Sequence, residues 1–115
     1  MNEPGLLSLG EQEVLHIEVE SEHYQLPPDD VRNLLFTGRA APLMKVQKPD
    51  PGEQQPRVTI EGHCALNRSG KAIVFYSVMG RFIIPVVSFR RVARGDVVSA
   101  PLFPLVPGEP GGDNE

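Results

Sequence analysis

Three successive runs of extended-chain character, joined by two turn signals, constrain the fold of this 115-residue chain most. In the first run, apolar or small residues alternate with mainly polar ones, at Val58, Ile60, Gly62, Cys64 and Leu66. This two-residue period predicts a strand over Arg57–Leu66 with one core face. Asn67–Gly70 then favours a turn. The apolar run in Lys71–Val78 follows, so these two segments are expected to form a hairpin.

The third run, Arg81–Val92, is apolar on both faces as far as Phe89. It predicts a strand that is buried on both sides, as in the core of a barrel or sandwich. Pro85 interrupts it and cannot donate to a ladder, which indicates an edge, a bulge or a bend at that point. The reversal before this run centres on Met79 and Gly80, where a type I turn with Gly80 in the left-handed conformation is expected.

Three further elements are expected upstream. Alternating apolar and polar residues predict a strand within Glu13–Glu20. Two prolines, two acids, helically spaced apolar residues and a terminal glycine predict a short helix at about Pro28–Phe36, lying on the sheet. Leu43–Gln47 is consistent with a short strand, and the proline-rich stretch Lys48–Pro56 with a surface loop.

The ends of the chain are expected to contribute less to the folded domain. Residues 1–12 are interpreted as a flexible N-terminus, residues 13–106 as a single β-rich domain, and residues 107–115 as a disordered tail. Ala100–Val106 is too apolar for water and too rich in proline for a central strand. It is expected to pack as an extended edge segment on its own barrel, or else on a neighbouring subunit.

The fold class that follows is mainly β. The chain is expected to form a small, partly open barrel or sandwich of about five to six strands with one short helix. The alternative is an α+β roll, in which that helix packs across one face of a meander.

Composition limits the classes of partner and the cellular locations that fit this chain. A net charge of -4 and a pI near 5.3 argue against a protein that coats nucleic acid by bulk charge. Cys64 has no second cysteine to pair with, which is typical of a reducing compartment. A leader pattern and an apolar run of the roughly 20 residues that span a bilayer are both absent from the sequence. A cytoplasmic location without membrane contact is therefore expected.

Charge is segregated along the chain. Residues 57–94 contain seven bases and one acid, a balance of +6, whereas residues 1–56 carry -6 and residues 95–115 carry -4. Six of these bases lie at or near predicted strand ends and turns, namely Arg68, Lys71, Arg81, Arg90, Arg91 and Arg94. If they converge, they form a site for an anion through guanidinium hydrogen bonds. The alternative is a set of solvated residues that protect sheet edges.

We therefore expect a non-enzymatic binding or regulatory module that recognises an anionic partner through this basic patch. The partner is a phosphate-bearing ligand, an acidic protein segment or, with less support, nucleic acid. The alternative is a structural protein that self-associates into a homo-oligomer through a sheet edge and Leu102–Val106. No cofactor is predicted.

Other candidate chemistry has less support. His63 and Cys64 are neighbours in a strand and point to opposite faces, so the imidazole cannot activate the thiol, and Cys64 is expected in the core. His16, Glu18 and Glu20 share one strand face with Glu22 and His23 beyond, which fits either a zinc or manganese site or an ordinary wet face. Four aromatic residues are expected in the core rather than on a stacking platform for bases: Phe75, Tyr76, Phe82 and Phe89.

Overall fold

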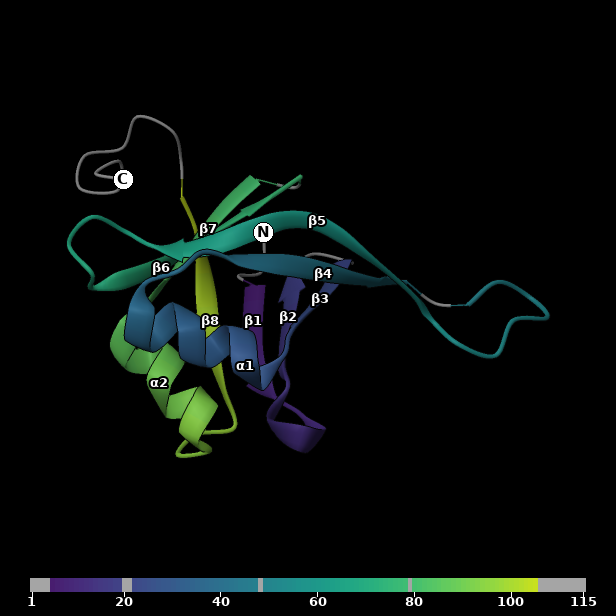
Figure 1. Ribbon diagram of the computed structural model, residues 1–115, viewed down its shortest axis with the longest axis horizontal. Helices are drawn as coiled ribbons and strands as arrows, with labels where there is room; N and C mark the ends of the chain where they lie inside the picture. The colour runs from purple at the N-terminus through teal and green to yellow at the C-terminus, as the bar shows by residue number, and fades with distance from the viewer. Residues whose placement is uncertain (1–4, 20–21, 48, 79, 106–115) are drawn as a thin grey trace.

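The computed structural model describes residues 5–19, 22–47, 49–78 and 80–105, and in this part of the chain eight antiparallel strands form a closed barrel (Figure 1). The strands follow one another around the barrel in chain order: β1 (Gly5–Leu9), β2 (Leu15–Val19), β3 (Glu22–Leu26), β4 (Ala41–Gln47), β5 (Arg57–Leu66), β6 (Ala72–Ser77), β7 (Gly80–Pro85) and β8 (Ser99–Pro104). β8 pairs with β1 and closes the barrel.

The helical elements interrupt this meander in three places. A single 3-10 turn, η1 (Glu11–Glu13), joins β1 to β2. Helix α1 (Pro28–Arg32) continues into one π-helical turn, η2 (Asn33–Thr37), and helix α2 (Val86–Arg94) lies between β7 and β8. Figure 1 shows α1 and α2 on the same side of the molecule, and their buried side chains belong to the same hydrophobic core as the barrel interior.

The prediction of a mainly β fold is confirmed, whereas both the strand count and the open closure were wrong. β1 is the first reason, because residues 1–12 were expected to be flexible. Leu7 in β1 is fully buried and pairs with Ile17 on one side and Ala100 on the other. A chain of antiparallel neighbours whose first and last strands meet has no edge left to open, so the α+β roll is excluded as well.

β8 is the second reason, because Ala100–Val106 was expected to form an edge segment. Leu102 is fully buried, so the described part of this segment does pack on its own barrel, but it pairs on both sides. Residues 99–102 pair with β1, and residues 103–104 pair with β7. Each half of β8 therefore pairs with only one strand and has one unpaired side. A proline whose nitrogen faces that unpaired side removes no ladder hydrogen bond. Val106 and the predicted tail at 107–115 lie outside the described residues.

The prediction of one strand over Arg81–Val92 was wrong, and so was the prediction of a single helix. β7 ends at Pro85, which has no N–H to donate to a ladder and occupies the extended N-cap position immediately before α2. Val86, Phe89 and Val92 are buried at a spacing of three residues, which places them on one side of a helix. The run that appeared apolar on both faces is therefore a short strand followed by an amphipathic helix. Gly95, with φ of 82°, ends that helix in the left-handed conformation.

The predicted helix at about Pro28–Phe36 is confirmed as α1 with η2. Pro28 occupies the first turn, where its missing N–H costs nothing, and Asp29 and Asp30 lie at the positive end of the helix. Val31 and Leu34 are buried against the barrel. Gly38, with φ of 72°, ends the segment as the sequence indicated.

A β-bulge in β5 overturns the prediction of one continuous core face. His63 pairs with Pro42, but Ile60 pairs with Met44, so Glu61 and Gly62 together lie opposite one residue of β4. The extra residue reverses the direction of all side chains before it. Cys64 therefore points into the core, whereas Val58 and Ile60 are 52% and 68% exposed.

The mouth of the barrel near this bulge is polar. Lys45 lies opposite Tyr24 in the β3–β4 ladder, and its Nζ is 3.0 Å from a carboxylate oxygen of Glu22 and 3.5 Å from one of Glu61. The hydrogen bond to Glu22 is the main cause that raises the pKa of Lys45. The barrel is thus filled by apolar side chains and ends in an ion-pair cluster. Among the described residues, no helix is long and apolar enough to cross a membrane.

Candidate functional site

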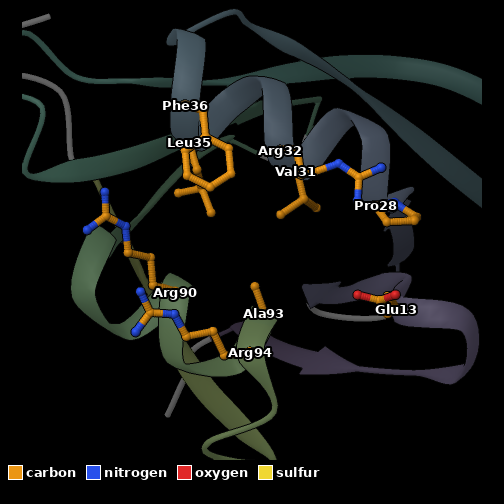
Figure 2. A pocket seen from close by; sticks show the side chains of 9 residues that line it. All are labelled: Glu13, Pro28, Val31, Arg32, Leu35, Phe36, Arg90, Ala93 and Arg94. Atoms are coloured by element: carbon orange, nitrogen blue, oxygen red, sulfur yellow. The ribbon is translucent and has the colours of Figure 1, made fainter.

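A cleft between the two helical segments is the candidate site. We call it the helix cleft; it has a volume of about 380 Å³ and is lined by Glu13, Pro28, Val31, Arg32, Leu35, Phe36, Arg90, Ala93 and Arg94 (Figure 2). α1 with η2 provides one wall, α2 provides the other, and η1 contributes Glu13 at the border. The volume lies in the range of small-molecule sites.

The α2 wall follows from helical periodicity. Phe89 and Val92 are fully buried against the barrel, so the residues beside them in the helix point away from it. Arg90 and Arg94 are four residues apart and therefore lie on one exposed face, one above the other. Ala93, next to Arg94 in the helix, also lines the cleft.

The opposite wall is apolar. Leu34 points into the core, while Val31 and Leu35, four residues apart, face the cleft. Phe36 also lines the cleft and is 76% exposed, an unusual position for a large aromatic side chain. Figure 2 shows Leu35 and Phe36 at the same end of the cleft as Arg90 and Arg94.

Charge is unevenly distributed in the cleft. Three arginines and one glutamate line it, so the formal charge of the lining is 3 - 1 = +2. Arg32 already forms an ion pair with Asp29, and it lies with Glu13 near Pro28, at the other end of the cleft in Figure 2. Within the described ranges, neither Arg90 nor Arg94 forms an ion pair. The end of the cleft beside Phe36 therefore offers two guanidinium groups to an incoming anion.

The six bases singled out in the sequence do not form one patch. Arg90 and Arg94 line the helix cleft, and together with Arg91 they line a second hollow of about 320 Å³ with Val87 and Asp96. Half of the predicted set thus comes together on α2. Arg91 and Arg94 also lie in the last turn of this helix, where a positive charge is favourable in any case.

The other three bases lie elsewhere. Arg68 and Lys71 lie in the β5–β6 turn, beside the start of α2, where the backbone N–H of Val86 donates to the carbonyl of Lys71 at 2.8 Å. Neither residue lines the helix cleft. Arg81 is the second residue of β7, about 13 Å from Pro85 at 3.3 Å per residue. Its guanidinium carbon lies 5.4 Å from the centre of the Tyr76 ring, outside the barrel.

Sequence reasoning missed Arg32, Leu35 and Phe36 as site residues. All three lie in the helix that the sequence did predict. Their role depends on α2 as the facing wall, and α2 was interpreted as a strand. The helical spacing of Val86, Phe89 and Val92 was the signal that could have identified this second wall.

Cys64 is confirmed as a core residue and is fully buried. Burial raises the pKa of its thiol to about 12. His63 lies on the outer face of β5, where its ring stacks on Tyr76 with centroids 4.7 Å apart. The two neighbours therefore point apart, as expected.

Two of the candidate metal ligands do meet. Nδ1 of His16 and Nε2 of His23 are 2.9 Å apart on adjacent strands. Burial, and secondly the nearby His23, lower the pKa of His16. In the part of the chain that the structure describes, which leaves out Glu20, no group of three or more histidines, cysteines or carboxylates is arranged to hold a metal ion.

The aromatic residues divide between core and surface. Phe75, Phe82 and Phe89 are buried, as predicted. Tyr76 was expected in the core but lies half-buried on the outer face between His63 and Arg81.

No protein-family model, curated protein or solved structure matches this chain.

Proposed function

We propose that the protein is a non-enzymatic binding module that takes a small anionic ligand into the helix cleft. The observation that supports this best is that Arg90, Arg94 and the exposed Phe36 line the same end of a cavity of ligand size. Two guanidinium groups without an ion-pair partner among the described residues, at the same end of a cleft as an exposed aromatic ring, are suited to a ligand that has both an anionic and an apolar part.

The chemistry of the lining suggests the form of that ligand. Arginine donates two parallel hydrogen bonds to a phosphate or carboxylate group. Phe36 offers a flat face, and Leu35 and Val31 offer apolar contact below it. A phosphate or carboxylate attached to a ring-shaped body fits this arrangement better than inorganic phosphate does.

A binding role is favoured over catalysis by the same residues. Arginine remains charged near neutral pH, so it orients an anion but does not exchange protons with it. The size of the cleft favours a small molecule over a nucleic-acid strand, which would need a longer cationic track along its phosphates.

The test is a titration of the isotope-labelled full chain, followed by amide NMR, with phenyl phosphate, inorganic phosphate, phenol and a short single-stranded oligonucleotide. We expect phenyl phosphate to bind most tightly and to shift amides of residues 28–37 and 86–94. The double variant R90E/R94E should lose this binding. R68E is the matched control, because it reverses an arginine charge outside the cleft, and it should retain most of it.

Two results would contradict the proposal. One is negligible binding of every probe at low salt. The other is an equal loss of binding in R68E and R90E/R94E, which would indicate attraction by general charge rather than by the cleft. Oligonucleotide binding that exceeds phenyl phosphate binding would favour nucleic acid as the partner instead.

A further inference from the structure

The β4–β5 ribbon has an edge that the barrel does not use. β5 spans Arg57–Leu66, yet within the described residues β6 pairs only with its second half, from Gly62 onwards. Residues 57–60 pair with β4 on one side, and no strand of the described chain pairs with the backbone N–H and C=O groups on the other side of residues 57–61. Figure 1 shows this ribbon and the loop after β4 reaching away from the barrel, which leaves the edge open to another chain.

The bulge gives this part of the ribbon an apolar outer face. Val58 and Ile60 are largely exposed there. They lie opposite Val46 and Met44 in the β4–β5 ladder, and both of those residues are half-buried. A single chain thus leaves a four-residue apolar stripe partly exposed to water, next to a strand edge that no described strand covers. Natural sheet proteins usually protect such an edge, so a partner strand is a physical explanation for it.

The sequence of the edge is complementary to itself. We propose that two copies of this chain associate by antiparallel pairing of residues 57–61, with the two-fold axis at Thr59. In this register Arg57 lies opposite Glu61 of the second copy, Val58 lies opposite Ile60 of the second copy, and the two Thr59 residues face each other. Opposite charges and β-branched pairs are the cross-strand neighbours that stabilise a sheet.

The pairing joins the two apolar stripes into one. Residues directly opposite in an antiparallel pair point to the same face, so Val58 of one copy contacts Ile60 of the other. The result is a continuous sheet of four strands, β4, β5 and their counterparts. The contact uses the same surface on both copies, so it closes as a dimer and does not propagate into a filament.

The present contacts of the charged residues do not prevent this. Arg57 lies 3.0 Å from Asp50 and 3.4 Å from Glu53, and its side chain is 59% exposed. Exposed ion pairs of this kind contribute little to stability, so the guanidinium can turn to Glu61 of the second copy at small cost. Glu61 keeps its contact with Lys45, because a carboxylate accepts from more than one donor.

Sedimentation velocity of the full chain, over a concentration series up to about 1 mM, tests the proposal. We expect a monomer–dimer equilibrium. I60K should raise the dimer dissociation constant at least about tenfold, because a charge then faces Val58 of the second copy. V98K is the matched control, because it changes the same kind of residue at a position that is 84% exposed and outside the ribbon, and it should leave the constant unchanged.

A charge swap distinguishes this register from other contacts. R57E alone and E61R alone should each weaken the dimer, because each places like charges opposite one another. The double variant R57E/E61R should restore the wild-type constant, since both symmetric pairs are then reversed together. The dimer dissociation constants of the variants are compared, and circular dichroism confirms that each variant is folded.

Crosslinking provides a second test of the register. In T59C, the two introduced thiols would lie across the two-fold axis at a Cα separation of about 4.5–5.5 Å, which allows a disulfide. Oxidised T59C should run as a covalent dimer, and V98C should not. A chain that stays monomeric at every concentration, or a double charge swap as weak as the single variants, would overturn the proposal.

Discussion

Gly62 determines which side chains of β5 face the surface. Its φ of 121° and its position in the bulge reverse the direction of the preceding side chains. A Cβ atom at this position would lie 2.1 Å from the carbonyl oxygen of Tyr76, so the β5–β6 ladder also requires a residue without one. One glycine therefore decides that Val58 and Ile60 face water while Cys64 faces the core.

The substitution G62A should destabilise the fold by a steric clash as well as by backbone strain. G80A is the matched control, since Gly80 has nearly the same φ, 122°, and no described atom beyond its chain neighbours lies within 4 Å of an added Cβ. We expect G80A to cost about 1–2 kcal/mol for the strained backbone conformation. G62A should cost at least about 2 kcal/mol more, because it forces the β6 backbone to move. Urea denaturation measures both variants, and equal losses would contradict the clash.

At the scale of elements, the β2–β3 hairpin contains a pH-sensitive contact. The two rings at His16 and His23 meet across the hairpin, and burial together with His23 lowers the pKa of His16, although Glu18 opposes this shift. The unfolded chain therefore takes up a proton near pH 6.5, before the folded chain does. Acidification below that value favours the unfolded state.

The prediction that follows concerns the difference in unfolding free energy between wild type and H16Q. The unfolding free energy of the wild type should fall relative to that of H16Q as the pH falls from about 7.5 to about 5, because only the wild type has His16 to protonate in the unfolded state. H63Q removes a histidine from the outer face of β5 and serves as the control. A wild-type curve that runs parallel to that of H16Q across this range would refute the prediction.

At the scale of the whole molecule, β8 holds the barrel together. It pairs with β1 at one half and with β7 at the other, and Leu102 inserts into the core between them. The residue next to it, Phe103, points outward and is 48% exposed. Closure thus depends on a segment that the sequence alone did not identify as a central strand.

Shortening Leu102 should therefore loosen both neighbouring strands together. L102A is expected to cost about 2–5 kcal/mol, as for other fully buried leucines. F103A, on the opposite face of the same strand, should cost about 1 kcal/mol or less. Chemical denaturation gives the free energies, and hydrogen exchange should show lost protection in both β1 and β7 for L102A. Loss in one strand alone would indicate that the barrel is not a single cooperative unit.

Local patterns in the chain were sufficient to predict several elements. The β5–β6 hairpin follows from alternation and a turn, and the helix from Pro28 follows from its capping residues and spacing. Burial of Cys64 and of three phenylalanines followed from their apolar neighbours. Each of these depends on residues within about ten positions of one another, which is the range that periodicity covers.

Features that depend on residues far apart in the chain became visible only in the folded molecule. An apolar run after Pro85 is equally compatible with a strand and a helix, and contact with the barrel selects the helix. Closure through β1 and β8 joins the two ends of the described chain, where local patterns were weakest. Arg90 and Arg94, two of the six predicted bases, line one cleft with Phe36 because the fold places α2 across that cleft from α1 and η2, about fifty positions away in the chain. Local periodicity carries no information on such an arrangement, because packing of distant elements on the same barrel creates it.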